Sequence, residues 1–420
     1  MPPLLIANSI GAEAFPDPRE VRVLMDVQKG LTTLLVMTLV AAAAPFICAL
    51  LVRIRLPQVV VFIVGGVLIG PQVLGWAHPD TVTLLSNVGL GFLFLLAGYE
   101  LDLELFREHV GRRAIVAWLV TAALAIAVTG ALSAVGFVRA FVPIAIGLTT
   151  TAFGALLPIL RDNDMLSGAF GRYILPAGAV GEFLPIVAIA VFLSAKGQIL
   201  GLVTLLLMFA VAALLAVLPR WATRPGFVKI SRAGENATSQ TTLRLTVAML
   251  FALLVVADRF GLDIVLGAFL AGIILKRWAP GDVHALESKL DAIGYGFFIP
   301  VFFITSGMNL DIASIAKAPQ RLLVFFVLLI VVRGLPAMFL YRHDLVPRQR
   351  LQMTLLTATA LPLLVALAEI GLSTGNMLPA NAAALVGAGV LSVILLPGVA
   401  VALNKKATPV TGPQPATVAD

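Results

Sequence analysis

Two ionisable side chains stand inside long apolar segments, where charge is rare. Glu182 lies in the run 176–185 and Arg333 lies in the run 329–336. A charge inside a membrane-spanning segment is costly and usually serves a function. A buried carboxylate binds either a proton or a small cation, and competition between the two gives obligatory exchange. The sequence therefore predicts that Glu182 is an ion- and proton-binding carboxylate.

Arg333 is the expected ion-pair partner of Glu182, because each half of the chain contributes one buried charge of opposite sign. The alternative is that such a pair only fixes helix packing, as buried ion pairs can do. No nucleotide loop, catalytic triad or metal-ligand cluster stands out. We therefore expect no enzyme activity, no cofactor and no metal beyond a transported cation. The single cysteine, Cys48, excludes an intrachain disulfide.

Threonine and proline recur together in two further apolar segments, whose relevant residues are Thr149, Thr150, Thr151 and Pro158 in the first and Thr357, Thr359 and Pro362 in the second. Proline frees backbone carbonyl groups in a helix, and threonine hydroxyls add neutral oxygen ligands. Broken helices near the midplane are typical of secondary transporters. We expect Thr150 and Thr151 to bind a cation beside Glu182, and Pro158, Thr359 and Pro362 to mark discontinuous, crossing helices. The alternative is ordinary kinking and packing, but the placement in both halves favours the functional interpretation.

Other acidic residues lie near the ends of apolar segments. Glu100, Asp263 and Asp311 are interpreted as solvated helix termini or interfacial ion pairs. Glu369 could line an exit path, although helix capping is the favoured interpretation.

Bulk composition places all these residues in lipid. Sixty per cent of the residues are hydrophobic, 12% are charged, and the mean hydropathy is +1.02. A soluble domain carries about 25% charged residues, so we expect an integral multi-pass membrane protein. The net charge of +7 does not indicate a nucleic-acid partner, because basic residues of membrane proteins collect in loops on one side.

Runs of about 20 apolar residues are long enough to span a bilayer. They predict an all-α protein with about thirteen transmembrane helices, of which two are short, so that twelve is an open alternative. The runs lie near 31–52, 57–75, 82–101, 113–136, 140–160, 173–195, 199–219, 243–258, 262–278, 292–310, 320–341, 350–371 and 378–403.

Loop charge predicts the orientation of these helices. With the N-terminus outside, inner loops hold 20 lysines and arginines and outer loops hold 8. The positive-inside rule therefore predicts an external N-terminus and a cytoplasmic C-terminus in the plasma membrane, the inner membrane of a bacterium. Residues 1–30 are expected to form an external segment, and residues 404–420 a disordered cytoplasmic tail.

The chain also resembles itself at an offset close to 208 residues. The three matching pairs are 62–68 with 269–275, 96–102 with 305–311, and 149–152 with 357–360. Two six-helix halves joined by a linking helix near 199–219 would have opposite orientation. This predicts an inverted-topology repeat, a common feature of secondary transporters.

Four motifs resemble the monovalent cation/proton antiporter superfamily, closest to its second branch of sodium/proton antiporters and potassium-efflux transport domains. They are 56–71 (LPQVVVFIVGGVLIGP), 94–102 (FLLAGYELD), 266–272 (LGAFLAG) and 302–311 (FFITSGMNLD). The resemblance implies a homodimer whose protomers have an exchanger domain over 31–403. Within it, core helices at 113–195 and 320–403 would hold the crossed discontinuous helices, and helices at 31–101 and 243–310 would form the dimerisation domain.

The resemblance also implies roles for residues. The family has an essential Asp on its sixth helix, which Glu182 matches, although Gly181 replaces the polar residue that often precedes it. Thr151 matches the threonine of the crossing motif. Ala152 stands where that motif often has Asp, and this Thr-Ala form is similar to the potassium-efflux members. Arg333 matches a basic residue on the eleventh helix. The single carboxylate would favour one-for-one exchange.

We therefore expect a secondary antiporter that exchanges protons for Na⁺ or K⁺ by alternating access. Its expected partners are these ions, membrane lipid and a second copy of the chain, with no nucleic acid. Two alternatives stay open: a potassium efflux pathway gated by a partner, and a transport-inactive membrane scaffold or sensor with the same fold.

Overall fold

The structure is a computed structural model that describes residues 18–50, 57–101, 107–193, 240–278 and 283–405, and in addition residues 202, 203, 206, 207 and 210. These residues form helices and no strand, which confirms the all-α prediction. Within them, nine helical stretches are long and apolar enough to cross a membrane. The expected linking helix near 199–219 lies almost entirely outside the described residues, so the count of thirteen stays a prediction.

The helices of the first half follow the apolar runs, but one expected span of this half is divided between two helices. The first-half helices are α1 (Pro18–Leu50), α2 (Gln58–Ile69), α3 (Thr83–Glu100), α4 (His109–Ala134), α5 (Phe141–Gly147), α6 (Phe153–Asp162) and α7 (Gly168–Phe192). α1 begins well before residue 31, where the sequence placed its start. The expected span at 140–160 is divided between α5 and α6.

The second half contains shorter pieces. They are α11 (Thr241–Phe260), α12 (Ile264–Trp278), α13 (Val283–Ile293), α14 (Ile299–Met308), α15 (Ile312–Lys317), α16 (Pro319–Leu328), α17 (Leu335–Leu340), α18 (Pro347–Thr357), α19 (Pro362–Ser373) and α20 (Pro379–Lys405). π-helical turns η3 (Gly294–Phe298) and η4 (Leu329–Gly334) connect α13 to α14 and α16 to α17. The expected span at 350–371 is divided between α18 and α19.

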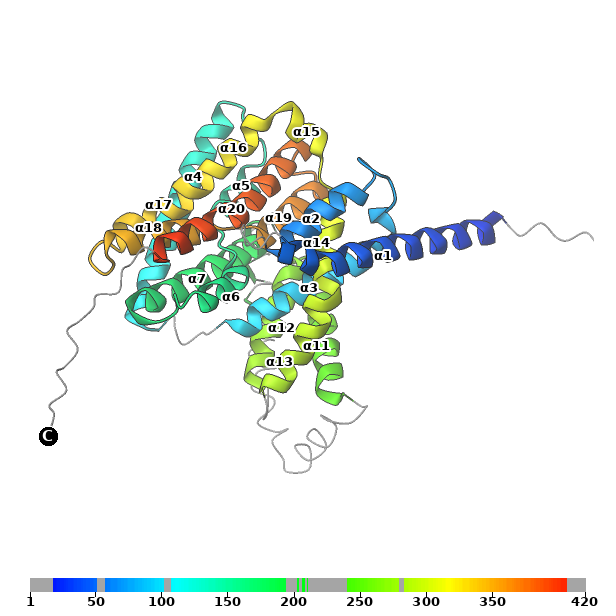
Figure 1. The fold of residues 1–420 in the computed structure, drawn as a ribbon, viewed down its shortest axis with the longest axis horizontal. Helices are drawn as coiled ribbons and strands as arrows, with labels where there is room; N and C mark the ends of the chain where they lie inside the picture. The colour runs from blue at the N-terminus through cyan, green and yellow to red at the C-terminus, as the bar shows by residue number, and fades with distance from the viewer. Residues whose placement is uncertain are drawn as a thin grey trace, which may run out of the picture.

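The helices pack in two groups (Figure 1). One group, here called the α3 bundle, contains α1, α2, α3, α11, α12, α13 and α14. The other, here called the α7 bundle, contains α4 to α7 and α16 to α20. Each bundle therefore combines helices from both halves of the chain. The assignment of the α7 bundle as a moving core and of the α3 bundle as a dimerisation domain stays a prediction.

Close backbone contacts hold the α3 bundle together at matching positions of the two halves. A Cβ atom on Gly98 of α3 would lie 2.1 Å from the carbonyl oxygen of Phe269 in α12. One on Gly307 of α14 would lie 2.2 Å from the carbonyl oxygen of Ile63 in α2. Only glycine permits these approaches. The two glycines occupy the same place in the matched segments 96–102 and 305–311, and each lets a helix of one half pack on a helix of the other.

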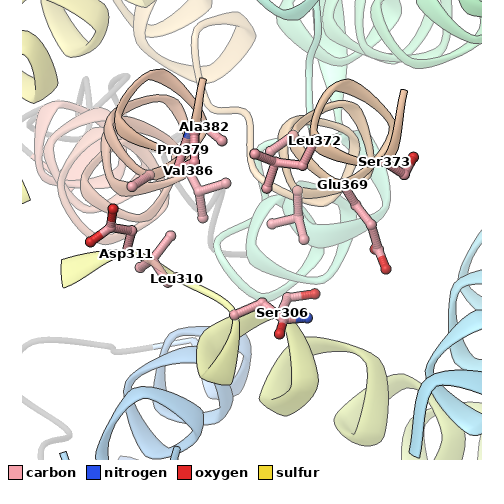
Figure 2. A pocket seen from close by; sticks show the side chains of 13 residues that line it. Ser306, Leu310, Asp311, Glu369, Leu372, Ser373, Pro379, Ala382 and Val386 are labelled. Atoms are coloured by element: carbon pink, nitrogen blue, oxygen red, sulfur yellow. The ribbon is translucent and has the colours of Figure 1, made fainter. Parts of the chain in front are cut away.

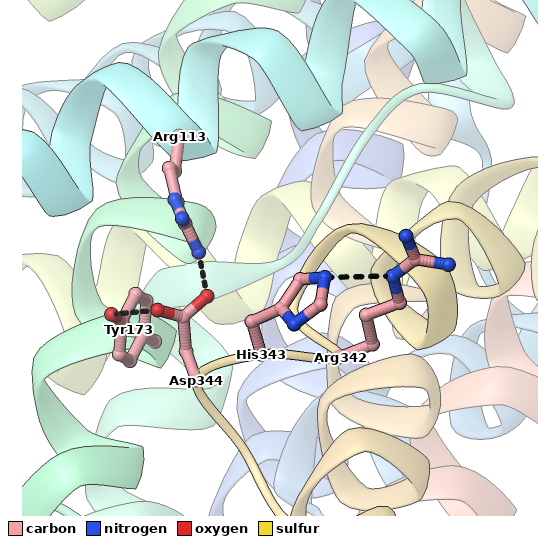
Figure 3. A network of polar contacts seen from close by, with 5 residues as sticks. All are labelled: Arg113, Tyr173, Arg342, His343 and Asp344. Atoms are coloured by element: carbon pink, nitrogen blue, oxygen red, sulfur yellow. Dashed lines mark hydrogen bonds and ion pairs between the residues drawn. The ribbon is translucent and has the colours of Figure 1, made fainter.

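A polar network ties several elements of the α7 bundle at one end (Figure 3). Asp344, in the turn between α17 and α18, forms an ion pair with Arg113 of α4 and accepts a hydrogen bond of 2.8 Å from the hydroxyl of Tyr173 in α7. Next to it, Arg342 Nε donates to His343 Nε2 at 3.0 Å. Three elements of the bundle are thus joined through one carboxylate.

Candidate ion-binding site

Two helix breaks face each other in the middle of the α7 bundle. α5 ends at Gly147 and α6 begins at Phe153, while α18 ends at Thr357 and α19 begins at Pro362. The backbone N–H of Ala152 donates to the carbonyl oxygen of Thr359 at 2.8 Å. Helix ends leave backbone groups without partners inside the helix, and here each break satisfies groups of the other. The segments 149–152 and 357–360, matched by sequence, are therefore in direct contact.

The threonines, rather than the prolines, form the first break. Thr149 and Thr150 donate their hydroxyls to the carbonyl oxygens of Ile146 and Gly147 at 2.7 and 2.9 Å, which satisfies the end of α5. Pro158 lies within α6. Pro362 is the first residue of α19, a position at which proline costs no helix hydrogen bond.

Thr151 joins three elements and is 2% exposed. Its hydroxyl donates to the carbonyl oxygen of Thr357 at 2.7 Å and accepts a hydrogen bond from Arg333 Nε at 2.9 Å. Its backbone N–H donates to the carbonyl oxygen of Gly181 in α7 at 2.9 Å. The crossing and helix α7 are therefore fixed to each other at this residue.

Arg333 lies in the π-helical turn η4 and is 3% exposed. In addition to Thr151 it contacts the carbonyl oxygen of Ala177, to which Nη2 donates at 3.1 Å. Through Thr151 its charge lies near the carbonyl oxygen of Thr357, at the C-terminal end of α18, where a helix carries partial negative charge. Among the described residues the structure records no ion pair between Arg333 and Glu182. The expected partners are both buried in the same bundle, but this conformation does not bring them into direct contact.

Gly181 provides the space that the arginine occupies. A Cβ atom at this position would lie 2.2 Å from Arg333 Nη2 and 2.5 Å from the hydroxyl oxygen of Thr151. Any side chain would displace one or both. The position next to Glu182 therefore lacks a second polar group because the guanidinium of Arg333 fills it. The sequence shows the glycine but gives no sign of what lies against it.

Glu182 is 9% exposed and lies in the middle of α7. Its carboxylate accepts a hydrogen bond from the backbone N–H of Gly154, in the first turn of α6. The N-terminus of a helix carries partial positive charge and stabilises an anion. In the part of the chain that the structure describes, no basic side chain forms an ion pair with Glu182.

A second carboxylate lies near Glu182. Glu100, the last residue of α3, interacts electrostatically with Glu182, and its Oε2 lies close to Gly154. Glu100 is exposed, and Glu287 and Asp291 of α13 add negative charge around it. The position of Glu100 at the end of an apolar segment predicted a solvated helix terminus and did not indicate this proximity. Its place in the motif 96–102 was the available signal.

One aromatic contact connects the two bundles directly beside Glu182. Phe183 of α7 stacks on Phe269 of α12, with ring centroids 5.5 Å apart and planes inclined by 23°. Phe269 is also the residue whose carbonyl lies against Gly98. The buried carboxylate therefore lies at the boundary between the bundles.

Comparison with known proteins identifies the family. The sequence model of the family described as "Sodium/hydrogen exchanger, transmembrane" matches residues 38–406. The chain belongs to this family. It is therefore a multi-pass membrane protein of a family that consists of transporters and not of enzymes, which confirms the resemblance to cation/proton antiporters.

Individual relatives of this exchanger-family chain are distant. The putative Na⁺/H⁺ antiporter YjbQ of Bacillus subtilis (strain 168) is 26% identical over 363 residues, which are 81% of this chain and 58% of YjbQ. The Na⁺/H⁺-K⁺ antiporter GerN of Bacillus cereus is 28% identical over 273 residues, 63% of this chain and 68% of GerN. The chain thus spans little more than half the length of YjbQ.

A solved structure shares the fold. The sodium/proton antiporter MjNhaP1 from Methanocaldococcus jannaschii superimposes with a TM-score of 0.59 and 15% sequence identity, over 91% of this chain and 99% of that one. The similarity extends over both bundles and confirms the antiporter type of fold.

Proposed function

We propose that this protein exchanges protons for a monovalent cation, Na⁺ or K⁺, and that both bind in turn to Glu182. The observation that carries the proposal is a buried carboxylate at a helix N-terminus, between two broken helices, without a basic partner among the described residues. Burying an unpaired charge is costly. The carboxylate therefore exchanges one ligand for another rather than standing empty, which couples the two ions.

The threonines of the crossing have different roles in this proposal. The hydroxyl of Thr150 donates a hydrogen bond to the carbonyl oxygen of Gly147, which leaves the lone pairs of the hydroxyl oxygen to act as a neutral cation ligand. The hydroxyl of Thr151 is already engaged with Thr357 and Arg333. Thr151 therefore contributes mainly by holding Arg333 and α7 in position.

The space at Gly181 supports a one-for-one exchange. Arg333 occupies the volume beside Glu182 where a second carboxylate would have to stand. A single carboxylate neutralises a single positive charge, so one proton would be exchanged for one cation. The names of YjbQ and GerN support Na⁺ and K⁺ as candidate substrates.

Transport would proceed by alternating access, with the α7 bundle moving as a unit against the α3 bundle. Such a movement has to separate or slide the contact between Phe183 and Phe269. We further propose that the α3 bundle forms a homodimer interface. The N-terminus would lie outside and the C-terminus in the cytoplasm of a bacterial inner membrane, surrounded by lipid.

The test is proton movement in everted membrane vesicles. We expect that Na⁺ or K⁺ restores the fluorescence of a quenched pH-sensitive dye with the unchanged protein and not with Glu182→Gln. The matched control is Glu108→Gln, which alters an exposed carboxylate at the start of α4 and should leave exchange unchanged. Undiminished exchange by Glu182→Gln would refute the site. Proton-independent K⁺ flux would favour a gated efflux pathway, and no flux with any cation would favour a scaffold.

A further inference from the structure

Helix α20 carries a buried serine that contacts the second helix break. Ser392 lies in the middle of α20 and is 0% exposed. Its hydroxyl oxygen accepts a hydrogen bond of 3.0 Å from the backbone N–H of Ala360. The same hydroxyl lies 3.0 Å from the carbonyl oxygen of Ala360, to which it can donate. One side chain therefore engages both backbone groups of a residue in the break between α18 and α19.

The break explains why Ala360 needs a partner from another helix. α18 ends at Thr357 and α19 begins at Pro362, so Ala360 lies outside both helices and is 1% exposed. A buried backbone group without a hydrogen bond is costly. The hydroxyl of Ser392 carries one hydrogen, which it shares between the carbonyl oxygens of Ala360 and Gly389, the latter at 2.7 Å. Ser392 thus supplies hydrogen bonds that the break removes from the helix.

A glycine one turn before Ser392 lies at a matching position of the repeat. Gly389 follows Gly181 by 208 residues, the offset that relates the two halves of the chain. A Cβ atom on Gly389 would lie 2.8 Å from the carbonyl oxygen of Ala360. In the first half, the carbonyl oxygen of Gly181 accepts a hydrogen bond from the backbone N–H of Thr151. Each break therefore packs against a glycine of a long helix, α20 or α7.

The two halves differ at the residue that follows the glycine. It is Glu182 in α7 and Val390 in α20. The second half therefore has no carboxylate at this place, and the polar contact between α20 and its break comes from the neutral hydroxyl of Ser392. This assigns binding of charge to one half and support of the crossing to the other.

Hydrogen bonds continue from the second break to the ion site. The carbonyl oxygen of Thr359 accepts a hydrogen bond of 2.8 Å from the backbone N–H of Ala152. The preceding residue, Thr151, donates its backbone N–H to the carbonyl oxygen of Gly181 at 2.9 Å. Gly181 directly precedes Glu182 in α7. A connected series of backbone contacts thus leads from α20 across both breaks to the residue beside Glu182.

We infer that Ser392 is a positioning residue of the ion site, which fixes the second break in the shape that the first break requires. The inference rests on the proposed function, because Ser392 acts through the crossing and does not touch the ion. Without the hydroxyl, Ala360 loses its partner and the break rearranges. The carbonyl of Thr359 then moves, and its hydrogen bond with Ala152 weakens. A cation site needs ligands that are held in place by such supporting contacts, so cation affinity falls.

The first measurement follows the backbone and does not depend on transport. Hydrogen–deuterium exchange is measured by mass spectrometry on purified protein, for peptides that cover residues 148–157. Ser392→Ala should accelerate exchange there about five-fold or more, the factor that corresponds to loss of one buried hydrogen bond. The matched control is Gln352→Met, which removes a hydrogen bond of 3.1 Å to the carbonyl oxygen of Ala400. It weakens the contact between α18 and α20 away from the break and should leave residues 148–157 unchanged.

The second measurement follows exchange in everted vesicles as a function of Na⁺ or K⁺ concentration. For Ser392→Ala we expect the half-maximal cation concentration to rise about five-fold, with a smaller change in the maximal rate. Ser392→Thr keeps a hydroxyl and should lie closer to the unchanged protein than Ser392→Ala does. Gln352→Met should keep the original cation dependence.

Three results would overturn the inference. They are unchanged deuterium exchange of residues 148–157 in Ser392→Ala, equal acceleration in Gln352→Met, and a loss of thermal stability in Ser392→Ala without any change in cation dependence. Where Ser392→Ala does not fold, Ser392→Cys takes its place, because a thiol is a weaker donor and acceptor. Absence of exchange by the unchanged protein would refute the proposed function, and deuterium exchange would still decide the role of Ser392.

Discussion

Two pairs of carboxylates lie along the boundary between the bundles. In the first pair, Glu182 of the α7 bundle lies near Glu100 of the α3 bundle. In the second pair, Glu369 of the α7 bundle and Asp311, which follows α14 of the α3 bundle, line one cavity of about 420 Å³ (Figure 2). Only the first pair adjoins broken helices and a buried arginine. The difference bears on the proposed function, since binding a partly dehydrated ion needs preorganised ligands, which the crossing beside Glu182 would supply.

The largest effect should come from filling the space at Gly181. In Gly181→Ala the new methyl group would overlap Arg333 and Thr151. We expect loss of exchange and destabilisation by about 1–3 kcal/mol, the usual cost of overpacking. Exchange assays and thermal unfolding in detergent measure both.

Gly398→Ala is the control, because a Cβ atom there meets open space in α20. Full activity of Gly181→Ala would show that the ion site does not depend on the position of Arg333. It would also contradict the contrast between the first and the second pair of carboxylates.

A smaller loss should follow removal of the shared hydroxyl at the crossing. Thr151→Val deletes the partner of both Arg333 and the carbonyl of Thr357. A buried group left without its hydrogen bond costs about 1–3 kcal/mol, and we expect slower exchange as well. Thr150→Val removes one bond to Gly147 and should cost less stability. It should instead weaken cation affinity if Thr150 is a ligand, so equal behaviour of the two variants would contradict their separate roles.

Glu100→Gln sharpens the comparison within the first pair. Glu100 is exposed and close to Glu182, so its charge should attract cations without holding them. We expect exchange to persist with an apparent cation affinity lowered about five-fold, the effect of about 1 kcal/mol. The dependence of exchange rate on Na⁺ or K⁺ concentration measures it. Complete inactivity would instead make Glu100 a direct ligand.

The smallest effect concerns the dependence of stability on pH at Asp263, in the turn between α11 and α12. Burial raises the pKa of Asp263 to about 6, so the folded protein holds this proton more tightly than the unfolded chain. The stability contribution is complete below about pH 4 and is lost as pH rises through about 6. We expect Asp263→Asn to remove this pH dependence from thermal unfolding curves.

Asp311→Asn provides a control of opposite sign. The pKa of Asp311 is lowered by its hydrogen bonds to Ser314, so its contribution is present above about pH 4 and is lost on acidification. An Asp263→Asn curve parallel to that of the unchanged protein would argue against a buried, titrating Asp263.

Hydropathy alone predicted the fold class and the burial of Glu182 and Arg333, because lipid penalises charge so strongly. The matched threonine segments indicated the two helix breaks, because the polar groups of threonine need hydrogen-bond partners inside an apolar bundle. The partner of Arg333 and the reason for Gly181 depend on contacts between residues far apart in the chain. One sequence carries no record of those contacts.

The reciprocal glycine contacts of the α3 bundle have a mechanical consequence. At Gly98 and Gly307, backbone rests on backbone, so there are no side chains whose rearrangement would let these helices shear. We therefore expect the α3 bundle to be rigid. In the proposed alternating access, movement would therefore occur at the boundary with the α7 bundle, where the ring of Phe183 stacks on that of Phe269. We therefore expect that no other residue can replace Gly98 or Gly307, whereas other large apolar residues can replace Phe183 and Phe269 at the boundary between the bundles.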